Sequence, residues 1–278
     1  MKYLSKFYIA LIFLILYAPI IVVILFSFNG SGSLSRFSGF TFHWYAELFR
    51  DGEALKALKN SLILAVLSSL LATVLGTLCA FAINRAKRKW FSRAVETVTN
   101  IPMMNPDIVT GVSMMLLFVG VAGLLGTKSL LGFPTMLIAH TTFNLPYVTL
   151  SVLPKFRQMD KSLTEAALDL GCTPAGTFFR VELPAILPGV LSGLMMSFTL
   201  SLDDFVISYF VYGPRFVTLP VEIYNYTKKP LQPKIYALFT LLFAAILLVM
   251  VVMNLLQERD AKRSRENRRA FRRKQVSA

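Results

Sequence analysis

Six long apolar segments constrain this 278-residue chain more than any other feature of its sequence. An α-helix rises 1.5 Å per residue, so about 20 apolar residues cross the hydrocarbon core of a bilayer. All six segments reach that length, and they cover residues 7–28, 60–83, 100–122, 133–153, 187–211 and 235–256. The sequence therefore predicts an all-α polytopic membrane protein with six transmembrane helices.

Composition supports this class, because 55% of the residues are hydrophobic and only 16% are charged. Soluble globular proteins carry about 25% charged residues. The first apolar segment, residues 7–28, is longer than the apolar region of a secretory signal, and no A-x-A-like cleavage site follows it. We interpret it as an uncleaved membrane span.

Lysine and arginine predict the orientation of the chain. Twenty of its 29 Lys and Arg residues fall in residues 1–6, 84–99, 154–186 and 257–278, which six spans place on one side. Positive residues concentrate on the cytoplasmic side of membrane proteins, so both termini are predicted to be cytoplasmic. The predicted domain organisation is a transmembrane domain over residues 1–257, with a cytoplasmic loop at 154–186, and a basic tail over residues 258–278.

The net charge of +14 raises the question of nucleic-acid binding, but much of the charge lies in the tail. Residues 258–278 hold nine Lys and Arg and three acidic residues. A solvated cytoplasmic tail close to anionic lipid headgroups accounts for this pattern. We predict no nucleic-acid partner.

Cysteine and histidine point to no metal or redox site. Cys79 and Cys172 supply neither a disulfide framework nor a set of metal ligands. His43 and His140 are far apart in the sequence and belong to no metal-binding motif, so we interpret each as a packing or hydrogen-bonding residue.

The first outer loop is rich in aromatic residues: Phe42, Trp44, Tyr45 and Phe49. Aromatic side chains favour the boundary between membrane and water. The pattern predicts a short amphipathic helix on the outer face.

The stretch "SLTEAALDLGCTPAGTFFRVELPAILPG" at 162–189 predicts two short helices in the second large cytoplasmic loop. Ser162 and Glu165 match a capping box at the start of the first helix. Gly171 is suited to the left-handed backbone conformation that ends a helix. Thr173 is the predicted cap of the second helix, with Pro174 in its first turn. One face of the first helix carries the apolar stripe Leu163, Ala166, Ala167 and Leu170.

This stretch resembles the coupling loop of the permease subunits of bacterial ABC importers. Those proteins carry E-A-A, three residues, G, nine residues and I-x-L-P, and this chain has "EAA" at 165–167, Gly171 and "VELP" at 181–184. The one departure is valine for isoleucine. The resemblance implies a type I importer (MetI-like) permease fold in the bacterial inner membrane, in which this loop docks on an ATPase subunit. The residues that it implies for coupling are Glu165, Ala166, Ala167 and Gly171.

Further segments extend the resemblance over nearly the whole chain except the basic tail. They are "GFTFHWYAELF", "NPDIVTGVSMMLLF", "HTTFNLPYV" and "LSLDDFVISYFVYGP", and together they are similar to PotC-type permeases of spermidine/putrescine importers. The resemblance implies a PotB-like second permease, two PotA-like ATPase subunits and an external PotD-like binding protein. It implies no cofactor on this chain, with ATP and Mg bound by the ATPase subunits.

The chain has no phosphate-binding loop of its own. The nearest approach to the G-x-x-x-x-G-K-[ST] pattern is "GLLGTKS" at 123–129, which lacks the Gly-Lys step. We therefore expect a non-catalytic subunit.

Two adjacent carboxylates, Asp203 and Asp204, interrupt the apolar run "LSLDDFVISYF" at 200–210. If the predicted span 187–211 is one helix, Asp203 lies about 24 Å along it, in the outer half of the membrane. Charged side chains at such depth are costly and mark functional sites. Adjacent helical residues point about 100° apart, so we expect one aspartate to face the transport path and the other to bind a neighbouring helix.

A polyamine would suit this region, because its ammonium groups pair with carboxylates and with aromatic faces. Tyr209, Phe210 and Tyr212 follow the aspartates, and Asp107 adds a carboxylate beside a predicted kink at Pro106. Structural roles remain open: inter-helix hydrogen bonds or a contact with the partner permease for the aspartate pair, and a helix cap for Asp107. The predicted substrate-pathway residues are Asp203, Asp204, Asp107, Tyr209 and Tyr212.

The leading hypothesis is thus the permease subunit of an ATP-driven polyamine importer. An ABC importer permease for another small solute is the first alternative. An ion-coupled secondary transporter is the second, but the pattern shows no pair of interrupted spans in corresponding halves. An intramembrane enzyme lacks support, because neither H-E-x-x-H nor G-x-S-x-G occurs.

Overall fold

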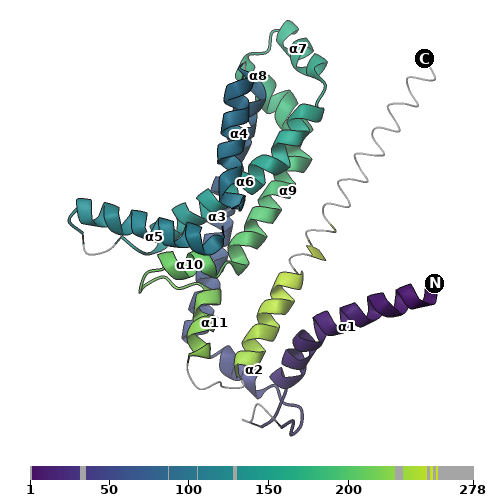
Figure 1. The fold of residues 1–278 in the computed structure, drawn as a ribbon, viewed down its shortest axis with the longest axis vertical. Helices are drawn as coiled ribbons and strands as arrows, with labels where there is room; N and C mark the ends of the chain where they lie inside the picture. Colours follow the sequence, from purple (N-terminus) through teal and green to yellow (C-terminus); the bar gives the residue numbers. More distant parts are fainter. Residues whose placement is uncertain are drawn as a thin grey trace. The chain divides into compact units, whose positions relative to one another are not determined.

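The computed structural model describes residues 2–31, 36–86, 88–104, 106–127, 130–228, 234–248, 251–252 and 255 (Figure 1). Its regular elements over these ranges are helices, and strand-like pairing is limited there to two isolated bridges. The predicted all-α class is confirmed. Contacts divide the chain into two compact units, Met1–Leu58 with Val221–Val251 and Lys59–Pro220 with Val252–Ala278.

Within the described ranges, five helical segments are long and apolar enough to cross a membrane. They are Lys6–Ser27, Gly52–Arg85, Asp107–Leu124, Phe133–Gln158 and Pro174–Asp203. The shorter apolar helix Lys234–Leu248 covers the first part of the sixth predicted span. The basic tail at 258–278 lies outside the described residues.

The first unit contains α1 (Lys2–Ser27), α2 (His43–Leu48) and the helix Lys234–Leu248. The predicted helix in the aromatic outer loop is α2. It is held against the end of α1 by Tyr45, whose hydroxyl lies 2.7 Å from the Ser27 hydroxyl, and by Trp44, whose ring N–H donates to the Asn29 carbonyl at 2.7 Å. Phe42 and Phe49 leave 74% and 60% of their surface exposed, as residues at a membrane surface do.

Asp51 ties the turn before α3 (Gly52–Arg85) to later parts of the first unit. Its carboxylate accepts the Glu53 and Ala54 N–H groups and so caps the helix. It also accepts the Tyr226 hydroxyl at 2.9 Å and the Lys234 ammonium at 3.3 Å. Burial alone raises the pKa of the Asp51 carboxyl, but these hydrogen bonds and the Lys234 charge outweigh it, and the pKa lies below its usual value.

The second unit is built on α6 (Phe133–Gln158) and α9 (Leu183–Asp203), which pack along each other in Figure 1. Two glycines spaced as G-x-x-x-G on α9 permit this contact. A Cβ added to Gly189 would lie 2.8 Å from the Ser151 carbonyl oxygen, and one on Gly193 would lie 3.1 Å from the Val148 Cα. Small residues let membrane helices approach closely where hydrophobic burial alone gives no preference.

Two buried apolar clusters fill the second unit. One gathers Ala80, Val152 and Ile186 near the coupling loop, and the other gathers Leu64, Met136 and Ile207 farther along the helices. The first cluster joins α3, α6 and α9. The second cluster joins α3, α6 and α10 (Val206–Val211). They hold both ends of the α6–α9 pair.

Two of the predicted continuous spans are interrupted. Residues 100–122 divide between α4 (Lys89–Met104) and α5 (Asp107–Leu124), because Pro106 has no N–H to donate within a continuing helix. The predicted span 187–211 divides between α9 and α10, with Asp204 and Phe205 between them. The kink predicted at Pro106 is confirmed, whereas the expectation of one helix over 187–211 is wrong.

A large side chain at Gly193 should weaken the second unit. We expect Gly193→Leu to lower the free energy of unfolding by about 1–3 kcal/mol, because the side chain meets the α6 backbone. Thermal unfolding of the purified protein measures this. Gly120→Leu on α5 is the matched control, since a Cβ there meets nothing within 4 Å. Equal losses for both variants would contradict the packing role of Gly193.

The Asp51 cluster predicts a pH dependence. A carboxyl whose pKa is lowered by folding stabilises the protein above its unfolded pKa of about 4, and this contribution is lost as the pH falls through the folded pKa. We expect Asp51→Asn to be less stable than the original protein at pH 7, with the difference shrinking below pH of about 4. Unfolding measured for both proteins across the acid range tests this. A difference that stays constant with pH would contradict it.

Candidate functional site

The predicted coupling loop folds into α7 (Lys161–Asp169), α8 (Pro174–Thr177) and the π-helical turn η1 (Phe178–Glu182). Asp160, and not Ser162, caps α7: its carboxylate accepts the Ser162 N–H at 3.0 Å. This bond lowers the pKa of the Asp160 carboxyl. The predicted capping box of Ser162 and Glu165 is therefore wrong. The helix begins two residues earlier than predicted, so Ser162 lies inside its first turn and donates its own N–H to Asp160.

The other turns of the loop are confirmed. Gly171 adopts a left-handed φ of 82°, and the N–H groups of Gly171 and Cys172 bond back to the Leu168 and Ala167 carbonyls. This is the Schellman pattern of a helix end. Thr173 caps α8 by accepting the Gly176 N–H at 3.1 Å, and Pro174 opens that helix.

The residues predicted for coupling lie on α7 and the turn that follows it. Glu165, Ala166 and Gly171 are exposed, whereas Ala167 is buried against the rest of the second unit. On the predicted stripe, Leu163 is 49% exposed and Leu170 is 86% exposed. An apolar face that the chain itself leaves uncovered is a ready surface for another protein.

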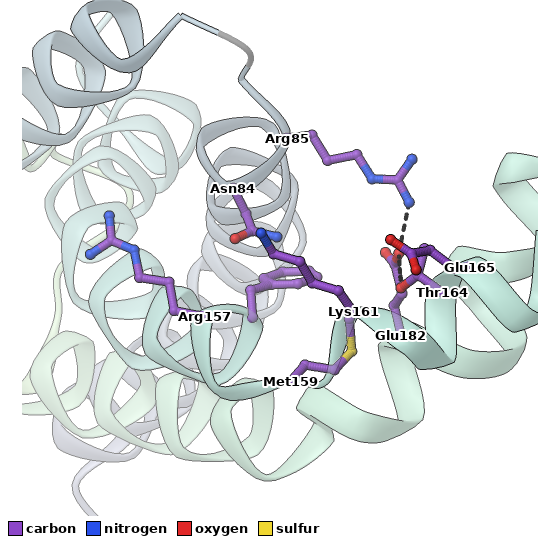
Figure 2. Close-up of a pocket in the computed structure, with 9 residues that line it drawn as sticks. Asn84, Arg85, Arg157, Met159, Lys161, Thr164, Glu165 and Glu182 are labelled. Atoms are coloured by element: carbon purple, nitrogen blue, oxygen red, sulfur yellow. Dashed lines mark hydrogen bonds and ion pairs between the residues drawn. The ribbon is translucent and has the colours of Figure 1, made fainter.

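A cavity of about 430 Å³ lies beside α7 (Figure 2). Charged groups dominate its lining, which consists of Asn84, Arg85, Phe156, Arg157, Met159, Lys161, Thr164, Glu165 and Glu182. The sequence prediction did not include Glu182 among the site residues. Its one local signal is an acid at the variable position of "VELP", next to an apolar span. The structure buries this side chain to 4% exposure.

The two aspartates have different environments because the helix ends between them. Asp203 is the last residue of α9 and is exposed. Asp204 adopts an extended backbone, and its carboxylate accepts the Ile207 N–H at 3.3 Å and the Ser208 N–H at 2.7 Å. Asp204 thus caps α10, and the expected 100° separation on one helix does not apply.

His140 on α6 joins this break to two further helices. Its Nδ1 lies 2.7 Å from the Ser201 hydroxyl, and its Nε2 lies 3.0 Å from the Ser208 hydroxyl and 3.4 Å from the Asp204 carboxylate. Ser201 in turn lies 2.9 Å from Ser68 on α3. The interpretation of His140 as a hydrogen-bonding residue is confirmed, and the network ties the α9–α10 break to α6 and α3.

The other predicted pathway residues lie on separate elements. Asp107 is exposed in the first turn of α5, and no side-chain bond caps that helix, so its alternative role as a cap has no support. The rings of Tyr209 and Tyr212 are 6.2 Å apart on and just after α10. Helix α10 packs on α5, where Phe210 approaches Gly111. The aromatic residues and Asp107 therefore belong to contacting helices.

Metal chemistry finds no support in the part of the chain that the structure describes. No group of three or more His, Cys, Asp or Glu residues is arranged there to hold a metal ion. Cys79 and Cys172 are both free thiols.

Comparison with known families decides the class. Residues 72–265 match the family model of the binding-protein-dependent transport system inner membrane component. The chain belongs to this family. It is therefore a permease subunit of an ABC importer in the inner membrane, and ATP hydrolysis resides on separate ATPase subunits.

Two permeases of known transport systems are similar to this chain over most of their length. The putrescine transport system permease protein PotI of Escherichia coli K12 is 37% identical over 261 residues, covering 94% of this chain and 93% of that protein. The spermidine/putrescine transport system permease protein PotC of the same strain is 39% identical over 249 residues, covering 90% and 91%.

Solved permease structures share the fold. A chain of a bacterial ABC transporter that imports the polysaccharide alginate superposes with a TM-score of 0.76 at 19% identity, covering 93% of this chain and 95% of that one. A chain of the MetNI methionine transporter gives a TM-score of 0.61 at 18% identity, covering 73% and 94%. The type I importer permease fold is thus confirmed, and an ion-coupled secondary transporter is not supported.

The His140 network predicts a stability effect in this permease. We expect His140→Leu to lower the free energy of unfolding by about 1–3 kcal/mol, because Ser201 and Ser208 lose buried hydrogen-bond partners. Thermal unfolding in detergent measures the loss. His43→Leu is the matched control, because His43 lies exposed on α2. If His140→Leu unfolds like the original protein, the network does not hold the α9–α10 break.

Proposed function

We propose that the chain is the permease subunit of an ATP-driven importer of polyamines, of the spermidine and putrescine class. The observation that carries the proposal is the similarity over most of the chain to PotI and PotC, whose names state these substrates. The carboxylate of Asp203 supports it, since an exposed acid at the end of a membrane helix is suited to an ammonium group.

The proposed assembly pairs this chain with a PotB-like permease, so that each supplies half of the pathway. Two PotA-like subunits would bind ATP and Mg, and a PotD-like binding protein would deliver the polyamine from outside. The proposed docking residues for one ATPase are Glu165, Ala166, Ala167 and Gly171. Glu165, Ala166 and Gly171 are exposed on α7 and the turn after it, whereas Ala167 is buried in the same helix.

In the proposed pathway Asp203 carries the main role and Asp204 a structural one. Asp203 ends α9 with its side chain exposed, whereas the Asp204 carboxylate accepts two backbone N–H groups and lies beside His140. Tyr209 and Tyr212 would present aromatic faces to the cation on the far side of the break. Asp107 is the proposed second carboxylate.

Uptake of labelled spermidine and putrescine by cells that express the complete transporter tests this function. We expect Asp203→Asn to reduce uptake by about tenfold or more, because bonds to a charged group contribute about 1.5–3 kcal/mol. Membrane abundance should stay unchanged. Asp204→Asn should lower abundance as well as uptake.

Glu53→Gln is the control, because Glu53 is an exposed acid at the start of α3. Normal uptake by Asp203→Asn would remove Asp203 from the pathway. If the original transporter carries neither polyamine, the substrate assignment is wrong and an importer for another small solute takes its place.

A further inference from the structure

Glu182 is a buried carboxylate at the junction between the coupling loop and α9. It is the last residue of η1, and its side chain is 4% exposed. A charge at such burial is costly unless partners satisfy it. The position of this acid is therefore determined by the groups that meet it.

Two other elements supply those partners. Arg85, the last residue of α3, donates to Glu182 Oε1 at 2.7 Å, and the Thr164 hydroxyl of α7 donates to the same oxygen at 3.2 Å. Figure 2 shows both bonds meeting at this carboxylate. One oxygen atom thus joins α3, α7 and η1.

Aromatic contacts reinforce the α3 side of this junction. The Arg85 guanidinium lies 4.8 Å from the centre of the Phe81 ring, and Phe81 meets the Phe178 ring of η1 edge-on at 4.9 Å. The end of α3 and η1 are therefore packed together independently of Thr164. The hydrogen bond from the Thr164 hydroxyl to Glu182 links α7 to them.

The backbone at this junction is unusual. Pro184 lies in the first turn of α9 and has no N–H to offer the Arg180 carbonyl. The chain enters α9 through the π-turn η1, and π-turns are rare and frequently occur at functional sites. The charge-assisted bonds of Glu182 stabilise the turn from outside the helix.

We propose that Glu182 is a positioning residue for coupling, which joins α7 to the cytoplasmic ends of α3 and α9. When the ATPase displaces α7, both membrane spans then move with it. The proposal rests on the membership of the permease family and does not depend on which solute is imported.

Thr164→Val is the sharpest variant, because it removes the hydroxyl while Arg85 still pairs with Glu182. We expect the number of solute molecules imported per ATP hydrolysed to fall about 2- to 30-fold, the usual range for residues along a coupling route. ATP hydrolysis by the assembled complex should persist. Thr164→Ser keeps the donor and should restore the ratio. An unchanged ratio in Thr164→Val would overturn the proposal.

A second ion pair of the same unit provides the control. Arg157 on α6 pairs with Glu96 on α4 at 2.8 Å, with both side chains partly exposed. Glu96→Gln should leave the ratio unchanged, whereas Glu182→Gln should lower it. Equal losses in both variants would show that the Glu182 junction has no special role.

A distance measurement tests the proposal without any knowledge of the solute. Spin labels are placed at Leu168 on α7 and Leu78 on α3, after Cys79 and Cys172 are replaced by serine. We expect the same distance in the nucleotide-free and the vanadate-trapped transporter, and a broader distribution in Thr164→Val. A distance that changes between the two states of the original protein would overturn the proposal. An absence of polyamine uptake, by contrast, would count only against the proposed substrate.

Discussion

Backbone polar groups have no water partners inside a bilayer, and this constraint governs where the helices of this permease can end. At the α9–α10 break the Asp204 carboxylate accepts two backbone N–H groups that the interrupted helix leaves free. His140 lies beside this carboxylate and hydrogen-bonds the serines on either side of the break. The break also separates the two acids, because α9 ends at the exposed Asp203 while Asp204 continues in an extended backbone.

Features determined by local chemistry could be predicted from the sequence. The apolar segments follow from composition, and the turns at Gly171 and Thr173 follow from residue types that suit a left-handed end and a helix cap. The two short helices of residues 162–189 follow from the same residue types, and the structure forms them as α7 and α8. Such features need no knowledge of distant parts of the chain.

Features determined by distant contacts could not be predicted in this way. Ser208 and His140 are 68 residues apart, and Arg85 and Glu182 are 97 residues apart, so neither the helix break nor the buried pair is visible in a local pattern. The predicted cap of α7 was wrong for a different reason. Asp160 and Ser162 are both residue types that cap helices, and only the structure shows that Asp160 is the cap of α7.

Helix α9 connects the proposed coupling junction directly to the proposed pathway residue Asp203. It starts after Glu182 and ends at Asp203, a length of about 30 Å at 1.5 Å per residue. Gly189 and Gly193 seat it on α6, and α6 also carries His140, so one close-packed pair of helices holds both the coupling junction and the break beside Asp203. Tightly packed interiors transmit displacement with little compression. We therefore expect a shift imposed on the loop end of this pair to reach the carboxylate end through the same two helices.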